Sequence, residues 1–157
     1  MQRAIAPPAL LAAAAVAFAA GCGGGEPPTR AEYQESVVAT RDDVDAALAS
    51  ITQASSKDDL LERMESAGAR IEREADELGD TTPADGFEDE NDELEDALHQ
   101  LAVDLTTTAD QIRRPDVGLE DLMAGARGLS FESWTQADRV LARLRQQGVR
   151  VPPLARH

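Results

Sequence analysis

The helical pattern of this chain is clearest in the stretch FEDENDELEDALHQLAVDLTTTADQI, residues 87–112. One set of residues in it recurs at alternating spacings of four and three: Phe87, Asn91, Leu94, Leu98, Leu101, Leu105, Thr108 and Ile112. Such spacings place side chains on one face of an α-helix, and most of the intervening residues are polar or charged. The pattern predicts an amphipathic helix of about 39 Å.

Two similar stripes precede this stretch, and a shorter one follows it. The first stripe contains Tyr33, Val37, Thr40, Val44, Ala47, Ile51 and Ala54. The second contains Leu61, Met64, Gly68, Ile71, Ala75 and Leu78. The last contains Trp134, Ala137, Leu141 and Leu144, and is stopped by Gly148. Together the stripes predict three long helices and a shorter fourth helix.

Capping and turn residues separate these stripes. Thr29 and Glu32 have the spacing of a capping box, and Ser56 is suited to the N-cap of the second helix. Gly79 is a candidate C-cap for the second helix, and Pro115 blocks continuation of the third. Because the turns between the long helices are short, consecutive helices should pack antiparallel.

The overall fold follows from these elements. No segment alternates apolar and polar residues for long enough to be a strand. We therefore predict an all-α fold, an antiparallel helical bundle of three long helices plus a shorter C-terminal helix, spanning residues 30–148. A further short helix is indicated around residues 119–123. Residues 149–157, which contain Pro152 and Pro153, are predicted to be a loose C-terminal tail.

The N-terminal segment has the three parts of a secretory signal peptide. Arg3 is the only charged residue before Glu26, and an apolar stretch at residues 9–20 is followed by small residues. Because a membrane-spanning helix needs about 20 apolar residues, this stretch is too short to span a bilayer. An uncleaved anchor or a buried helix is the alternative interpretation.

The junction Ala19-Ala20-Gly21-Cys22 resembles the lipobox of bacterial lipoproteins. The resemblance implies that Cys22 receives a diacylglyceryl group and that the signal, residues 1–21, is cut after Gly21. Residues 22–29 would then be an acylated, Gly- and Pro-rich tether. The expected location is the extracytoplasmic face of a cell membrane, where the protein is held by its lipid anchor.

Composition narrows the possible partners. The chain has 15 basic and 30 acidic residues, and its formal net charge at pH 7 is −15. Nucleic-acid binding is therefore not expected, since phosphate contacts need a basic surface. Cys22 is the only cysteine, so no internal disulfide can form.

The stretch 72–96 is strongly acidic, with 13 Asp and Glu residues and a single basic residue, Arg73. Three interpretations remain open: a solvated helix face and turn, a docking surface for a cationic partner, or weak binding of divalent cations. The register of an EF-hand loop is absent, and no metal site is predicted. The possible partner surface consists of Asp85, Glu88, Asp89, Glu90, Asp92 and Glu93.

The charge balance reverses in residues 113–157, which contain eight arginines and five acidic residues. One interpretation is that the last helix packs near the acidic stretch, so that the two charges offset each other. The other is that these arginines contact anionic lipid headgroups or an acidic envelope polymer.

Few residues carry recognisable chemistry. His99 follows Asp96 at a helical spacing, but di-iron bundles need this pair twice, so we expect a surface histidine. Trp134 either packs in the core or stacks on a ligand. Asn91 lies either in a frayed first turn or at a position that fixes helix register. No nucleophile–base motif is present, so we predict no catalytic residue, no cofactor and no enzymatic activity.

The sequence therefore predicts a membrane-anchored extracytoplasmic lipoprotein without catalytic activity. Its helical bundle would bind or scaffold an envelope protein or polymer. The alternative is a carrier or sensor that holds a small molecule or cation in a bundle cavity near Trp134.

Overall fold

The computed structural model describes residues 28–114 and 131–155, which contain helices and no strand. The helices are α1 (Arg30–Ile51), α2 (Lys57–Gly79), α3 (Glu88–Ile112) and α5 (Glu132–Gln146). The prediction of an all-α bundle with three long helices and a shorter C-terminal helix is confirmed. Cys22, with the signal peptide and most of the tether, lies outside the described residues, as does the short helix expected around residues 119–123.

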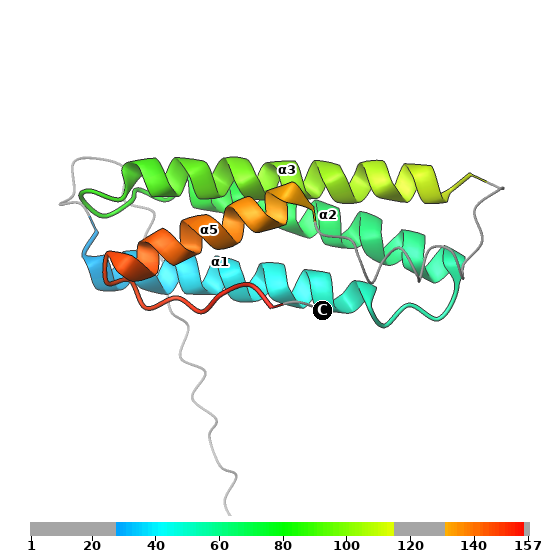
Figure 1. The fold of residues 1–157 in the computed structure, drawn as a ribbon, viewed down its shortest axis with the longest axis horizontal. Helices are drawn as coiled ribbons and strands as arrows, with labels where there is room; N and C mark the ends of the chain where they lie inside the picture. Colours follow the sequence, from blue (N-terminus) through cyan, green and yellow to red (C-terminus); the bar gives the residue numbers. More distant parts are fainter. Residues whose placement is uncertain (1–27, 115–130, 156–157) are drawn as a thin grey trace, which may run out of the picture.

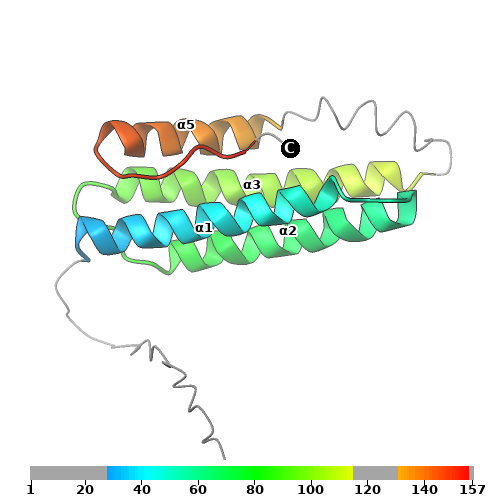
Figure 2. The ribbon, with the colours of Figure 1, turned by 90° about the horizontal axis from the view of Figure 1, so that it is seen from below.

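The three long helices run side by side in alternating directions, and α5 lies against α3 (Figures 1 and 2). The pairs in contact are α1 with α2, α2 with α3, and α3 with α5. This order brings four chain positions to one end of the bundle: the start of α1, the end of α2, the start of α3 and the end of α5 (Figure 1). Because the α2–α3 turn carries many carboxylates, we name this end the acidic end.

The predicted N-caps are present. At the start of α1, the Thr29 N–H donates to Glu32 Oε2 at 2.8 Å, and the Glu32 N–H donates to Thr29 Oγ1 at 3.3 Å. At the start of α2, Ser56 Oγ accepts from the Asp59 N–H at 3.1 Å. These bonds satisfy backbone donors that a helix start leaves unpaired.

The two glycines expected at helix ends differ. Gly148 has φ +93°, the Gly148 N–H donates to Arg145 O at 3.1 Å, and the Val149 N–H donates to Leu144 O at 2.9 Å. This is a Schellman motif, which ends α5 as predicted. Gly79 remains inside α2, and the residue after it keeps right-handed helical angles. The prediction of Gly79 as the C-cap is therefore wrong.

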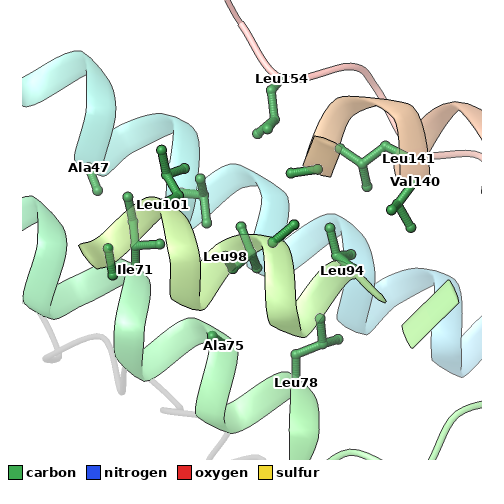
Figure 3. Packing of buried hydrophobic residues seen from close by; sticks show 14 of the residues in the cluster. Ala47, Ile71, Ala75, Leu78, Leu94, Leu98, Leu101, Val140, Leu141 and Leu154 are labelled. Atoms are coloured by element: carbon green, nitrogen blue, oxygen red, sulfur yellow. The ribbon is translucent and has the colours of Figure 1, made fainter. Parts of the chain in front are cut away.

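Most members of the predicted stripes form the core (Figure 3). The buried residues of α3 are Asn91, Leu94, Ala97, Leu98, Leu101, Ala102, Leu105, Ala109 and Ile112. The buried set is wider than one stripe because α3 packs against both α2 and α5. The predicted Thr108 and Leu61 are only half-buried, and their neighbours Ala109 and Leu60 are buried instead.

A glycine allows α2 and α3 to approach closely. A Cβ atom at Gly68 would lie 3.2 Å from Thr106 Oγ1 and 3.3 Å from Ala102 O. Both distances are tighter than ordinary van der Waals contact, so a larger residue would require these neighbours to shift by a few tenths of an ångström. This explains why glycine occupies a mid-helix position, where it costs about 1 kcal/mol relative to alanine.

Residues 149–155 correct the prediction of a loose C-terminal tail over 149–157. Val149, Val151 and Leu154 are buried, and Leu154 is only 4% exposed. The segment runs along α1 and α5 in an extended course (Figures 1 and 2). We name residues 149–155 the C-terminal strap.

The strap packs because the helices leave apolar surface for it to cover. Leu154 lies in a groove whose other lining residues come from α1, α3 and α5: Thr40, Arg41, Val44, Leu94, Leu98 and Leu141. Pro152 and Pro153 cannot extend a helix, so the strap stays extended and reaches this groove. The space left beside Leu154 is only about 10 Å³, no more than one water molecule needs.

Candidate functional site

The α2–α3 turn displays most of the predicted partner surface to solvent. Asp85, Glu88, Asp89, Asp92 and Glu93 are exposed, and Glu90 is half-buried. Gly86 shapes the turn with a φ of +84°, and its N–H donates to Glu88 Oε2 at 2.9 Å. Acidic side chains are favourable here because the first turn of a helix carries the positive end of its dipole.

Two of the six predicted residues belong instead to an internal contact. Arg143 of α5 forms ion pairs with Glu90 and Glu93, and Gln147 Nε2 donates to Glu90 Oε1 at 2.7 Å. The hypothesis that the last helix packs near the acidic stretch is therefore confirmed at Arg143. Within the described residues, Asp85, Asp89 and Asp92 form no ion pair.

The acidic end also contains a stack that sequence reasoning missed. The guanidinium carbon of Arg30 lies 5.3 Å from the centroid of the Phe87 ring, in cation–π range. The rings of Phe87 and Tyr33 are 5.4 Å apart. Arg30 Nη1 also donates to Gln147 O at 3.2 Å. The stack joins the starts of α1 and α3 to the end of α5, elements too far apart in sequence for local patterns to pair.

Two buried polar atoms near this stack have no hydrogen-bond partner within the described part of the chain: Tyr33 Oη and Asn91 Oδ1. Burial raises the pKa of the Tyr33 phenol above its ordinary value, and the carboxylates of Glu90 and Asp92 add to the shift. Asn91 is 2% exposed, and its Nδ2 donates to Leu78 O of α2 at 3.3 Å. It therefore links two helices instead of lying in a frayed turn.

His99 is half-buried on α3. Its Nε2 atom lies 3.5 Å from Asp76 Oδ1 and 3.8 Å from Glu95 Oε1. Among the described residues, no group of three or more His, Cys, Asp or Glu side chains is arranged to hold a metal ion.

An open groove of about 720 Å³ runs along the outer face of α3 beside His99. It includes Val103, which is 55% exposed, and the exposed carboxylates of Glu72, Asp96 and Asp110. The groove is a surface feature outside the helical core. Trp134, near which the sequence placed a ligand cavity, is half-buried against the core and does not line this groove.

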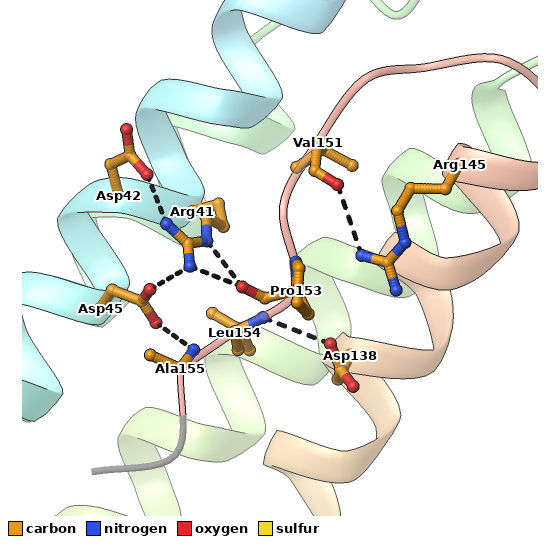
Figure 4. Close-up of polar contacts among 9 residues, drawn as sticks. All are labelled: Arg41, Asp42, Asp45, Asp138, Arg145, Val151, Pro153, Leu154 and Ala155. Atoms are coloured by element: carbon orange, nitrogen blue, oxygen red, sulfur yellow. Dashed lines mark hydrogen bonds and ion pairs between the residues drawn. The ribbon is translucent and has the colours of Figure 1, made fainter.

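The second candidate site is the set of side chains that hold the strap (Figure 4). From α1, Arg41 donates to Pro153 O from Nε at 3.0 Å and from Nη2 at 2.5 Å. Asp45 Oδ1 accepts from the Ala155 N–H at 3.0 Å. Farther along α1, Gln34 Oε1 accepts from the backbone N–H of residue 150 at 2.7 Å.

The opposite wall of this site is α5. Asp138 Oδ1 accepts from the Leu154 N–H at 3.2 Å, and Arg145 Nη1 donates to Val151 O at 3.4 Å (Figure 4). Contacts from both walls therefore end on main-chain atoms of the strap. Sequence reasoning missed this site because an extended segment of seven residues, with aliphatic side chains at irregular spacing, has no periodicity to detect.

Comparison of the chain with protein-family models, with curated proteins and with solved structures gave no match. Within the described ranges, none of the helices combines the length and the apolar character needed to cross a bilayer.

Proposed function

We propose that this protein is a membrane-anchored extracytoplasmic lipoprotein without catalytic activity, whose bundle binds a cationic partner in the cell envelope. The proposal rests first on the lipobox-like junction at Gly21 and Cys22. The observation that supports the mode of binding is that the chain enters the bundle at the acidic end.

The length of the tether relates the anchor to the acidic end. Only seven residues separate Cys22 from Arg30. Eight extended steps span at most about 28 Å, so an acylated Cys22 would keep the acidic end close to the bilayer surface. Two acyl chains with about 30 buried methylenes, at roughly 0.8 kcal/mol each, would make this anchoring stable.

The charges of the acidic end indicate the chemistry of the partner. Asp85, Asp89 and Asp92 are exposed and take part in no ion pair with the described residues. Repulsion would disfavour anionic lipid headgroups at this surface, whereas a basic protein segment near the membrane would be attracted. Exposed ion pairs contribute up to about 1 kcal/mol each, so the complex should weaken as salt is added.

The anchor is tested with Cys22→Ser. An alkyne palmitate analogue should label the wild-type protein in cells, and the variant should lose the label and leave the membrane fraction. Labelling of the variant at the wild-type level would contradict the lipid anchor.

The partner surface is tested by crosslinking in native membranes with Asp89→Asn/Asp92→Asn. A matched control is Asp58→Asn/Glu62→Gln, since Asp58 and Asp89 each occupy the second position of their helix and all four residues are exposed. Crosslinked partners should be lost from the first variant and kept by the second. Equal recovery from both would show that the acidic end is only a solvated surface.

A further inference from the structure

We propose that the groove holding the C-terminal strap is a binding site for an extended segment of a partner protein, and that the strap occupies it as a built-in competitor. The strap groove consists of the socket around Leu154 and the polar side chains of α1 and α5 that flank it. This inference does not depend on the lipid anchor or on the acidic surface.

The first argument is that the groove recognises the backbone of its occupant. Gln34, Arg41 and Asp45 on one wall, and Asp138 and Arg145 on the other, all bond to main-chain atoms of the strap. Main-chain recognition gives affinity that does not depend on the occupant's side chains, as in strand addition to sheet edges. A different chain with the same extended course can satisfy the same bonds.

The second argument is that part of the polar site is organised without the strap. The Arg41 guanidinium is held by Asp42 Oδ1 at 2.7 Å and by Asp45 Oδ2 at 2.5 Å, all on α1. Arg41 therefore keeps its orientation when Pro153 departs, and the groove pays little of the usual ordering cost of binding.

The third argument defines the chemistry of the partner. Aliphatic side chains are buried at the first, third and sixth positions of the strap, namely Val149, Val151 and Leu154. Arg150, between the first two, is exposed. The polar walls contain two arginines and the three carboxylates of Asp42, Asp45 and Asp138, so an acidic occupant is disfavoured. The fitting partner is a neutral or basic extended segment with aliphatic residues at these three positions.

The tether makes the strap a strong competitor. A segment joined to α5 through a short turn competes at an effective concentration of about millimolar. A partner segment can bind only those molecules in which the strap has left the groove. Its apparent affinity is therefore its intrinsic affinity multiplied by the fraction of such molecules. A substitution that weakens the contacts between the strap and the groove should therefore raise the apparent affinity for the partner segment.

The test uses the full chain in detergent micelles and a fluorescent peptide with the sequence of residues 148–155. We expect Leu154→Asp to bind this peptide at least tenfold more tightly than the wild-type chain, as measured by fluorescence anisotropy. Replacing the leucine of the peptide by aspartate should abolish binding, whereas replacing its exposed arginine by serine should change affinity less than threefold. Adding Arg41→Ala to Leu154→Asp should weaken peptide binding at least tenfold.

Other outcomes overturn the proposal. If Leu154→Asp keeps the wild-type helical circular dichroism but binds no peptide, the groove does not accept a segment in trans. If Leu154→Asp loses helical signal, the peptide should restore it, and failure to do so would also contradict the site. If light scattering shows a wild-type dimer that Leu154→Asp abolishes, the occupant is the strap of a second copy and the partner assignment is wrong.

Discussion

Two segments of the core, helix α3 and the strap, are supported in contrasting ways. Helix α3 satisfies its backbone internally and buries a regular series of leucines. The strap buries three aliphatic residues but has few backbone bonds of its own, and its polar atoms rely on side chains from α1 and α5. The comparison shows that similar burial can rest on very different support. We therefore expect α3 to open only when the whole bundle unfolds, and the strap to open locally while the helices stay folded.

The contrast predicts the largest loss of stability at the centre of α3. Leu101 is fully buried, between elements that cannot separate without unfolding the bundle. Leu101→Ala should lower the free energy of unfolding by about 3–5 kcal/mol, through lost burial and a cavity. Urea denaturation followed by circular dichroism measures this. A loss below about 1 kcal/mol would mean that α3 is not the centre of the core.

A smaller loss is expected for the same substitution in the strap. Leu154→Ala removes an equal side chain, but the strap can detach while the helices remain folded. We therefore expect a loss of about 2 kcal/mol, together with faster hydrogen exchange at the Leu154 and Ala155 amides and unchanged exchange in α3. Faster exchange throughout α3 would show that the strap is an integral part of the bundle and would remove the contrast.

The sequence predicted α3 well and the strap wrongly, for a physical reason. A helix that buries one face repeats its apolar residues every three or four positions, so Leu94, Leu98 and Leu101 identify the buried face. In the strap, Pro152 and Pro153 are equally compatible with a loose tail and with an extended packed segment. Only the three-dimensional arrangement of α1 and α5 distinguishes these alternatives.

The same limit applies to the acidic surface. The local density of carboxylates was visible in the sequence, and the exposure of Asp85, Asp89 and Asp92 agrees with it. The pairing of Glu90 and Glu93 with Arg143, 50 residues or more away, depends on how α5 packs on α3. Local patterns therefore located the surface but overestimated how much of it is available to a partner.

The contribution of polar contacts to holding the strap is measured by a substitution with a smaller expected effect on stability. Arg41→Ala removes both bonds to Pro153 O and leaves Asp45 without its cation, which should cost about 1–2 kcal/mol. Arg41→Lys should restore only part of this, because an ammonium cannot replace a two-nitrogen contact. The exposed Arg139 is the control, and Arg139→Ala should change stability by less than about 0.5 kcal/mol. Equal effects at Arg41 and Arg139 would show that the bonds from Arg41 do not stabilise the strap.

The smallest effect, with the opposite sign, is expected at the acidic end. In the strap, the N–H groups of Leu154 and Ala155 donate to carboxylates. The hydroxyl of Tyr33, in contrast, is buried without a hydrogen-bond partner in the described part of the chain. Tyr33→Phe removes this unsatisfied group while keeping the ring against Phe87, so the free energy of unfolding at pH 7 should rise by up to about 1 kcal/mol. A loss of stability would reveal a partner for the hydroxyl, such as a bound water molecule.

The pH dependence of the free energy of unfolding, compared between the wild-type protein and Tyr33→Phe, gives a second measurement of the Tyr33 phenol. Burial raises the pKa of Tyr33 above its ordinary value near 10, so the unfolded chain releases this proton before the folded one does. Ionisation of this group therefore leaves the free energy of unfolding unchanged below about pH 10 and lowers it as pH rises above that value. Tyr33→Phe should lack this part of the alkaline loss. Since Tyr33 is the only tyrosine in the chain, absorbance at about 295 nm reports its ionisation alone, and ionisation at pH 10 without unfolding would show that the phenol is accessible to solvent.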